Sequence, residues 1–301
     1  MIIVKIQGGL GNQMFEYALY EWLRHNGKDA KIDISHYGAA KKSGAADTVH
    51  NGYELEKLFS LSPVYATFKE AGRLGEVRTD IIYKLWRKFV RKRNKKTHIT
   101  RIDFDGNRWY LNELLDMDNI YLDGYWCTYK YADEIRDTVL KSFTFPEFSG
   151  EADRKNIEAS EIIKNTNSVS IHVRHGDYLK LQNVYCNLGS EYYNNAIKKI
   201  EETVESPVFF CFSDDIEWCR ENIKAENIHF IDWNKGNDSY KDMQLMSLCK
   251  HNILANSTFS MWGAWLNRNP DKRVIRPKRV FVDPTDEIVD FWPDEWVVID
   301  N

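Results

Sequence analysis

The sequence has few cysteines and no long apolar run, and each shortage excludes a class of protein. Its 301 residues include 5 cysteines, an odd number without C-x-x-C spacing, so neither a disulfide framework nor a zinc site is indicated. No apolar stretch approaches the roughly 18 residues that a membrane-spanning helix needs. The first residues also lack the charged start and cleavage site of a signal peptide. We therefore expect a cytoplasmic protein with reduced thiols.

The sequence also lacks an excess of charge of either sign. Its 41 lysines and arginines against 45 acidic residues give a net charge of −4, which argues against nucleic acid as a partner. One segment is an exception, because residues 84–96 hold eight cations. We expect residues 78–96 to form a solvated helix packed on the core. The alternative is an amphipathic helix that makes peripheral contact with an anionic membrane surface.

Apolar residues, by contrast, are plentiful. They make up 43% of the chain and aromatic residues 14%, enough for the cores of two domains of roughly 150 residues each. A break at Phe145–Gly150 follows an expected helix at 131–143 and marks a linker at about 145–156. We therefore predict domains at 1–150, the expected acceptor side, and 151–301, with about the last 15 residues packing back on the first domain.

Short apolar strands alternate with helical segments along the chain. The first half opens with a strand at 2–6, a glycine loop and a helix at 13–25, followed by a strand at 31–34. Less regular stretches lead to helices at 53–61 and 78–96 and a strand at 119–123. The second half predicts strands at 169–173, 208–212, 228–231, 252–255 and 273–275, with helices at 191–204, 216–223, 240–249 and 258–267 between them. This is the pattern of an α/β protein with doubly wound parallel sheets, whose ligands bind beyond the carboxyl ends of the strands.

The first polar strand end is the loop Gly8-Gly9-Leu10-Gly11-Asn12-Gln13. It joins a strand to a helix, so its backbone amides and the helix dipole favour an anion. It matches neither G-x-G-x-x-G nor the P-loop, which disfavours a dinucleotide site or an ATPase. Asn12 and Gln13 add amides that suit phosphate or sugar hydroxyls. The alternative is a tight turn that needs a positive φ.

The second polar strand end is His172-Val173-Arg174-His175-Gly176-Asp177. His172 and Arg174 alternate along the strand and therefore share a face. A guanidinium offers a planar fork for a pyrophosphate. Asp177 is placed to orient that arginine or to accept a proton. The alternative is an ion pair that only closes the strand.

Two further strand ends carry polar groups. In Ser213-Asp214-Asp215, one carboxylate is expected to cap the following helix, and the alternative is that it accepts N–H donors from a guanine edge. Adjacent aspartates at a helix start diverge, so we assign no metal. In Asn256-Ser257-Thr258-Phe259-Ser260, hydroxyls and amides gather at a helix N-terminus, either for an anion or as caps.

Three long segments resemble the signature segments of bacterial alpha-1,2-fucosyltransferases. They are Gly8–Ala18 (GGLGNQMFEYA), His172–Tyr178 (HVRHGDY) and Asn256–Trp265 (NSTFSMWGAW). The resemblance implies a GT-B-like architecture, in which two Rossmann-like domains face one another across a cleft. It also implies an inverting transfer of L-fucose from GDP-L-fucose to the 2-hydroxyl of a terminal galactose in a glycan, with no metal cofactor.

The resemblance also implies roles for particular residues. Arg174 would bind the β-phosphate and neutralise the GDP leaving group, and Asn12 would reach phosphate or fucose from the other domain. His172 and Asp214 would hold ribose or guanine, and the hydroxyls that follow Asn256 would hold phosphates. The expected donor-binding residues are Gly9, Gly11, Asn12, Gln13, His172, Arg174, Ser213, Asp214, Asn256, Ser257, Thr258 and Ser260.

This chain departs from the family pattern at three positions. It has His175 where the family usually has a second arginine, Met261 where it has a tryptophan, and Glu16 where glutamine is commoner. Asp177 is the first candidate for the catalytic base, and the alternative is that it braces Arg174. Two other functions stay open: a fucosyltransferase of another linkage, and a non-catalytic nucleotide-sugar- or carbohydrate-binding protein of the same fold.

Overall fold

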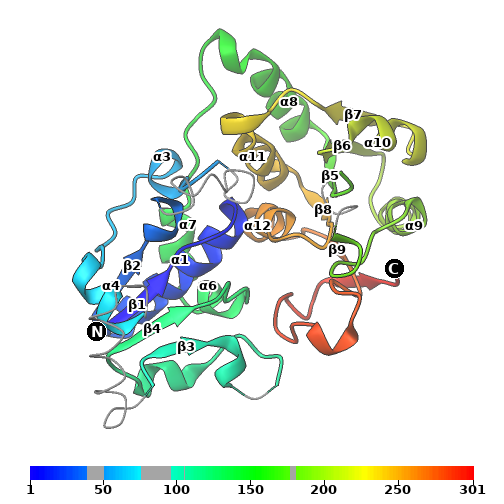
Figure 1. Cartoon of the computed structure of the whole chain (residues 1–301). Helices are drawn as coiled ribbons and strands as arrows, with labels where there is room; N and C mark the ends of the chain where they lie inside the picture. The colour runs from blue at the N-terminus through cyan, green and yellow to red at the C-terminus, as the bar shows by residue number, and fades with distance from the viewer. Residues whose placement is uncertain (39–50, 76–95, 105, 177–180) are drawn as a thin grey trace. The chain divides into compact units, whose positions relative to one another are not determined.

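The chain folds into two compact units, each with its own parallel sheet (Figure 1). The computed structural model describes residues 1–38, 51–75, 96–104, 106–176 and 181–301. Unit 1 consists of Met1–Thr144 and Ile288–Phe291, and unit 2 of Phe145–Glu287 and Trp292–Asn301. The basic segment 78–96, except for its last residue, and Asp177 lie outside the described residues.

The sheet of unit 1 has four parallel strands in the order β2-β1-β4-β3. Their apolar side chains, such as Ile3, Val4 and Leu122, are fully buried. The strands are β1 (Ile2–Lys5), β2 (Ala30–Asp33), β3 (His98–Thr100) and β4 (Ile120–Asp123). The predicted strands at 2–6, 31–34 and 119–123 are confirmed, and β3, which is only three residues long, was not predicted.

Helices cover the sheet of unit 1. The long helix α1 (Leu10–His25) buries the apolar side chains of its inner face, among them Met14 and Trp22. The prediction of one helix at 131–143 was wrong, because the backbone turns at Ile135 (φ −120°, ψ 36°) and separates two short helices. Other helices described in this unit are α3 (Leu55–Leu58), α4 (Phe68–Leu74), α6 (Lys130–Glu134) and α7 (Arg136–Ser142).

A short C-terminal segment is part of unit 1. The carboxylate of Asp290 accepts hydrogen bonds from the backbone N–H groups of Trp109 (2.8 Å) and Tyr110 (2.7 Å). The ring of Phe291 packs against Phe15 of α1, with centroids 5.9 Å apart. The segment is thus held both by a buried carboxylate and by an aromatic contact.

The sheet of unit 2 has six parallel strands in the order β10-β9-β8-β5-β6-β7. The strands are β5 (Asn167–Val173), β6 (Pro207–Ser213), β7 (Ile228–Ile231), β8 (His251–Ile253), β9 (Val274–Pro277) and β10 (Val297–Ile299). Five of these strands were predicted. The sixth, β10, was not predicted; it is a short strand whose two valines are exposed. Both sheets are parallel and covered by helices, which confirms the α/β class.

Two groups of helices cover the two faces of this sheet (Figure 1). Val169, Ile171 and Val173 of β5 share an apolar core with Tyr193 and Cys219 from the helices of one face. That face carries α9 (Ser190–Glu201) and α10 (Ile216–Asn222), and the other carries α8 (Arg154–Asn165), α11 (Tyr240–Leu248) and α12 (Thr258–Leu266). Helix α8 was not predicted, since part of it fell in the proposed linker.

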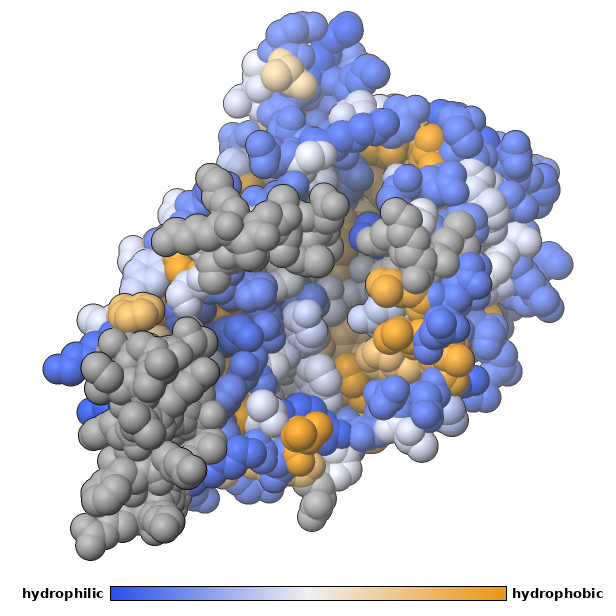
Figure 2. Space-filling view, in the orientation of Figure 1, coloured by the Kyte–Doolittle hydropathy of each residue, from blue (hydrophilic) through white to orange (hydrophobic). Residues whose placement is uncertain are grey.

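The surface drawn in Figure 2 is mostly hydrophilic, with scattered apolar patches. The exposed apolar side chains include Phe68 and Val289, and the two valines of β10. Within the described ranges, no helix combines the length and the apolar character that crossing a membrane requires.

Gly75 lets α4 lie close to the sheet of unit 1. A Cβ atom at this position would stand 2.6 to 2.8 Å from three atoms of the Tyr121 ring. Such distances are far below ordinary van der Waals contact, and the ring of Tyr121 is buried. Only glycine therefore fits where α4 ends.

We expect Gly75→Ala to lower the free energy of unfolding by about 1–3 kcal/mol, because the buried ring must shift to accept a methyl group. Urea denaturation followed by circular dichroism measures this. The matched control is Gly124→Ala, whose Cβ would meet Trp126 at ordinary contact distances of 3.4 Å and more. Equal stability of the two variants would contradict the proposed steric conflict.

Candidate functional site

The clearest group of polar side chains lies at the carboxyl ends of β5 and β6 in unit 2. Arg174 follows β5, and its side chain is 27% exposed; its Nη1 lies 3.5 Å from Oδ2 of Asp214. The other oxygen of Asp214, Oδ1, accepts hydrogen bonds from the backbone N–H groups of His175 (3.0 Å) and Gly176 (3.2 Å). One carboxylate therefore holds the turn after β5 and orients the guanidinium.

Asp214 thus acts on the protein itself, whereas the sequence suggested contact with ribose or guanine. A Cβ at Gly176 would stand 3.3 Å from Oδ2 of Asp214, so glycine allows this close approach. Arg174 and Asp214 form an ion pair at the end of the strand, which agrees with the alternative interpretation of this segment. It still leaves the arginine about a quarter exposed at the strand end.

Two neighbouring side chains fix the orientation of the His175 ring. Its Nδ1 lies 2.8 Å from Oδ2 of Asp215, and its ring stacks on the indole of Trp218 with centroids 4.5 Å apart and planes 19° from parallel. Oδ1 of Asp215 accepts a hydrogen bond from the backbone N–H of Trp218 and so caps α10, which confirms the predicted cap. Ser213 Oγ accepts from the backbone N–H of Asp215 (2.9 Å).

His172 is buried on the face of the sheet that α12 covers. Its side chain is 5% exposed, and its ring lies 5.5 Å from that of Phe259. Among the described residues, its Nδ1 has no hydrogen-bond partner. Burial, with the positive charge of Arg174 acting in the same direction, lowers the pKa of His172 to about 3. The imidazole is therefore neutral at neutral pH.

The segment that starts α12 uses most of its polar groups internally. Asn256 Nδ2 donates to the carbonyls of Cys186 (2.8 Å) and Val280 (3.1 Å), which ties together the loops after β5 and β9. Ser257 caps the helix by accepting from Phe259 N, and Ser260 is fully buried and donates to backbone carbonyls. For the hydroxyl of Thr258 no hydrogen bond occurs within the described part of the chain. These contacts match the alternative of caps for Ser257 and Ser260.

The glycine loop of unit 1 is shaped by a positive φ, as its alternative interpretation required. Gly8 has φ 74°, and a Cβ there would stand 2.6 Å from Nδ2 of Asn12. Gly9 precedes α1, and its carbonyl accepts from the N–H groups of Asn12 and Gln13, while Gly11 is buried inside the first turn. The loop thus combines a tight turn with a helix N-terminus.

Gln13 and Asn12 differ in what they offer a ligand. Gln13 is fully buried; its amide donates to the carbonyls of Gly8 (3.1 Å) and Gly52 (2.8 Å), and its oxygen accepts from the N–H of Glu54 (2.9 Å). It therefore braces the loop. Asn12 is half-buried, and its Oδ1 lies 3.9 Å from the thiol of Cys127. Of the two amides, only that of Asn12 is partly open.

Glu16, one helical turn after Asn12, is a fully buried carboxyl group. Its Oε2 accepts a hydrogen bond from the backbone N–H of Gln7 (2.7 Å), and its Oε1 has no partner among the described residues. Burial raises the pKa of Glu16 well above its ordinary value, despite the hydrogen bond from Gln7 and the charge of Lys5. A protonated carboxyl is neutral and similar in shape to an amide, so glutamate here resembles the commoner glutamine.

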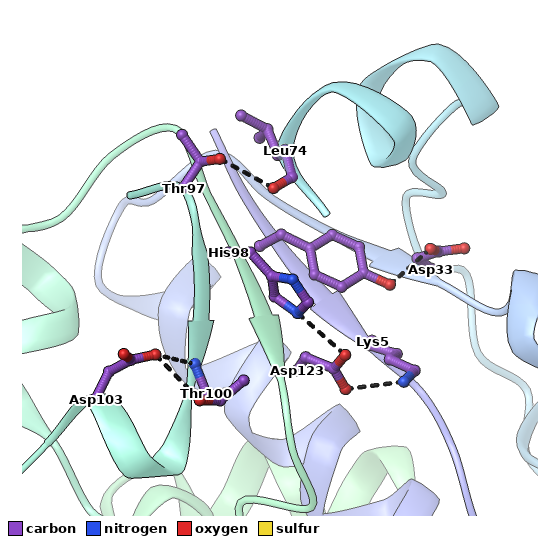
Figure 3. Close-up of polar contacts among 9 residues, drawn as sticks. Lys5, Asp33, Leu74, Thr97, His98, Thr100, Asp103 and Asp123 are labelled. Atoms are coloured by element: carbon purple, nitrogen blue, oxygen red, sulfur yellow. Dashed lines mark hydrogen bonds and ion pairs between the residues drawn. The ribbon is translucent and has the colours of Figure 1, made fainter. Parts of the chain in front are cut away.

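Sequence reasoning missed a second polar network, at the strands of unit 1 (Figure 3). Asp123, the last residue of β4, binds Lys5 of β1 (2.8 Å) and His98 of β3 (3.1 Å) through its two oxygens. Burial alone would raise the pKa of Asp123, but the bonds from His98 and Lys5 lower it to about 2. At the end of β2, Asp33 accepts from the hydroxyl of Tyr121 (2.9 Å). The signal in the sequence was a charged residue at the end of three strands: Lys5, Asp33 and Asp123.

Two candidates cannot be placed in this site. Asp177 lies outside the described residues, as does the basic segment apart from its last residue. The described residues contain no group of three or more His, Cys, Asp or Glu side chains that could hold a metal ion.

The sequence is similar to known glycosyltransferases over its whole length. A family model described as Glycosyl transferase family 11 matches residues 1–300. An alpha-1,2-colitosyltransferase from Escherichia coli is 30% identical over 311 residues, covering 100% of this chain and 99% of the relative. The O-antigen biosynthesis glycosyltransferase WbnK from Escherichia coli is 31% identical, covering 92% and 93%. A galactoside 2-alpha-L-fucosyltransferase, Sec1 from Mus musculus, is 26% identical, covering 88% and 64%.

The fold is similar to that of a solved fucosyltransferase. A crystal structure of the alpha-1,6-fucosyltransferase NodZ soaked with GDP-fucose superimposes with a TM-score of 0.51 at 14% identity, covering 88% of this chain and 91% of that chain. At this identity the likeness is one of fold, and it agrees with a GT-B-like protein built from two α/β units.

The buried carboxyl of Glu16 generates a prediction about pH and stability. In the unfolded chain this group titrates near 4.5, whereas in the folded protein it keeps its proton to a higher pH. Between these two values the folded state binds the extra proton, so wild-type stability falls as pH rises. Glu16→Gln has no proton to lose, and its stability relative to wild type should therefore increase with pH, by up to about 1.4 kcal/mol per pH unit.

Urea denaturation between about pH 5 and pH 8 measures this difference. The matched control is Glu113→Gln, which removes an exposed carboxyl from the same unit and should give a flat difference. A Glu16→Gln variant whose relative stability stays constant or falls with pH would show that the carboxyl is ionised in the folded protein.

Proposed function

We propose, because the chain belongs to glycosyl transferase family 11, that it transfers L-fucose from GDP-β-L-fucose to the 2-hydroxyl of a terminal galactose. The product would be an alpha-1,2-linked fucoside, formed with inversion at the anomeric carbon. The names of the relatives support the linkage: two of them are an alpha-1,2-colitosyltransferase and a galactoside 2-alpha-L-fucosyltransferase. The acceptor is a glycan that ends in galactose, in an oligosaccharide or glycolipid.

The observation that carries the proposal is the oriented guanidinium of Arg174. In the reaction, the bond between the anomeric carbon and the β-phosphate oxygen breaks, and the leaving GDP gains negative charge. A cation already held in place by Asp214 stabilises that charge without reorganising during the reaction. The planar fork of arginine suits two phosphate oxygens at once. Arg174 is therefore the proposed catalytic residue for departure of GDP.

The acceptor must lose a proton as its oxygen bonds to the anomeric carbon. Asp177, three residues after Arg174, is the proposed base. His172 is unsuited to a charged role, because its pKa of about 3 keeps it neutral. A neutral imidazole with an unused ring nitrogen suits a hydrogen bond to a hydroxyl of the donor.

The remaining contacts of the donor are proposed for fewer residues than the sequence suggested. The proposed contacts are Asn12, His172, Thr258 and Arg174, which is partly exposed beside Asp214. Gln13 and Ser260 act as braces beneath the loops, since their polar groups bind the backbone. We propose no metal ion in the reaction, and a cytoplasmic location, where reduced thiols persist. Peripheral contact with a membrane through residues 78–96 stays a prediction.

Transfer of colitose is a second candidate function. The alpha-1,2-colitosyltransferase matches the whole chain, and colitose is fucose without its 3-hydroxyl. A site that hydrogen-bonds this hydroxyl would reject the deoxy sugar strongly, whereas an apolar pocket would discriminate little. Turnover of GDP-fucose and GDP-colitose with the same acceptor therefore decides between the two donors.

We expect Arg174→Ala to lower kcat by about 100- to 1000-fold, because the charge on leaving GDP loses its main partner. Arg174→Lys should retain part of the activity, since it keeps the charge but not the fork. The assay measures GDP release from GDP-fucose with a galactoside acceptor, and methylation analysis gives the linkage of the product. The control is Arg154→Ala, an exposed arginine on α8. Normal turnover of Arg174→Ala would refute the proposed role.

The same assay tests the metal and the base. Full activity after treatment with EDTA is expected, and a loss that Mg²⁺ or Mn²⁺ restores would overturn the metal-independent reaction.

Asp177→Asn should lower kcat with little change in the KM for GDP-fucose. Near-normal turnover of this variant would end the proposal that Asp177 is the base. Binding of GDP without any transfer would favour the non-catalytic alternative, and another product linkage would favour a different fucosyltransferase.

A further inference from the structure

Arg276 is a half-buried arginine with no ion-pair partner among the described residues. It is the third of the four residues of β9. Its Nη1 donates to the carbonyl of the next residue, Pro277 (3.3 Å), and its buried Nε finds no hydrogen-bond partner in the part of the chain that the structure describes. No carboxylate of the described residues lies within ion-pair distance of it, although the charges of Asp294 and Glu287 act on it from further away.

A half-buried arginine lowers the stability of the folded protein unless an anion pairs with it. Burial lowers the pKa of Arg276 despite the two carboxylates nearby, which reflects the cost of keeping a guanidinium away from water. Uncompensated buried charges destabilise proteins strongly, and an anion that supplies the missing charge and acceptors removes this cost. The chain could avoid the cost with an apolar residue, as in the neighbouring Val274 and Ile275. An anionic ligand explains why a cation stands there.

The register of the sheet places Arg276 near the proposed donor site. Ile275 of β9 pairs with Ile253 of β8, which pairs with Ile171 of β5. Arg276 is therefore level with His172, two strands away, and shares its face of the sheet. The strand between them, β8, leads directly into α12. Arg276 within β9 and Arg174 just after β5 thus lie on opposite sides of the strand that leads to this helix.

Two observations at the N-terminus of α12 point to an anionic or polar ligand there. The helix begins at Thr258, and the positive end of its dipole favours an anion. Independently, His172 is 5% exposed, and its unpartnered Nδ1 lies in the ring that packs against Phe259 in the first turn of the helix. A buried ring nitrogen without a partner indicates a group that the described residues do not supply.

His175 does not provide the second cation, although it is closer to Arg174 in sequence. Its Nδ1 is paired with Asp215 and its ring is stacked on Trp218. The carboxylate of Asp215 neutralises any charge that the imidazole carries. Arg276 has no such carboxylate partner among the described residues.

We propose that Arg276 binds the diphosphate of the nucleotide sugar from the side of α12 opposite Arg174. This inference rests on the proposed function, because it takes a nucleoside diphosphate sugar as the donor. The two arginines then share the charge of the leaving group across the helix N-terminus. Two guanidinium forks bind a diphosphate at both phosphates, which a single cation does not do.

Isothermal titration of GDP, GMP and inorganic pyrophosphate tests the proposal. We expect Arg276→Gln to weaken GDP about 10- to 100-fold, the range for a lost hydrogen bond to a charged group. The loss for GMP should be clearly smaller, and pyrophosphate should weaken with GDP. Arg276→Lys should lie between wild type and Arg276→Gln, because it keeps the charge but not the fork. Added salt should weaken GDP binding more steeply in wild type than in Arg276→Gln.

The matched control is Arg273→Gln, which removes an exposed arginine just before the other end of β9. It should bind all three ligands like wild type. Unchanged affinity of Arg276→Gln for GDP would overturn the proposal. So would an equal loss for GDP, GMP and guanosine, which indicates a structural role. If Arg276→Gln does not fold, Arg276→Lys provides the same comparison.

The outcome is separable from that of the proposed function. If wild type binds pyrophosphate and Arg276→Gln binds it weakly, the diphosphate site stands even when GDP-fucose is not turned over. If wild type transfers fucose and Arg276→Gln keeps the wild-type KM and kcat, the donor proposal stands and the role of Arg276 is lost.

Discussion

The carboxylate of Asp214 is the interaction on which the candidate site depends. It accepts two backbone N–H groups from the turn after β5 and faces the guanidinium of Arg174. These contacts hold the turn after β5 and give the arginine a partner that orients it. Asp215 extends this arrangement by capping α10 and pairing with His175. Two adjacent aspartates thus organise one strand end through different contacts.

In both units, titratable side chains that are deeply buried are neutral, and charged side chains lie where strands end. His172 is buried and neutral because its pKa falls to about 3, and Glu16 is buried with a raised pKa. Charge survives on Asp123, which binds Lys5 and His98, and on Arg174. Arg276 departs from this rule, since it is half-buried, cationic and without an ion-pair partner among the described residues. An anionic ligand at such a position offsets the free-energy cost of the uncompensated buried charge.

Local patterns predicted most of the elements but not the roles of individual polar residues. All strands of unit 2 except β10, and the cap at the start of α10, followed from apolar runs and polar helix starts. Gln13 and Ser260 were expected to contact the donor, whereas their polar groups bind backbone carbonyls and amides. Sequence shows that an amide or a hydroxyl is present at a strand end, but its partner depends on loops far away in the chain. Gly52, which binds Gln13, is 39 residues distant.

The sequence by itself determined the α/β class, the family and the strand ends that carry polar groups, because these depend on residue type and short spacing. Only the tertiary structure decided which of those groups are already used. Strand order decided the position of Arg276. Its strand, β9, lies two strands from β5 in the sheet, although about 100 residues separate the two strands in sequence. Pairing in a parallel sheet joins segments that are remote in sequence. For that reason the second cation could not be predicted from the motif around Arg174.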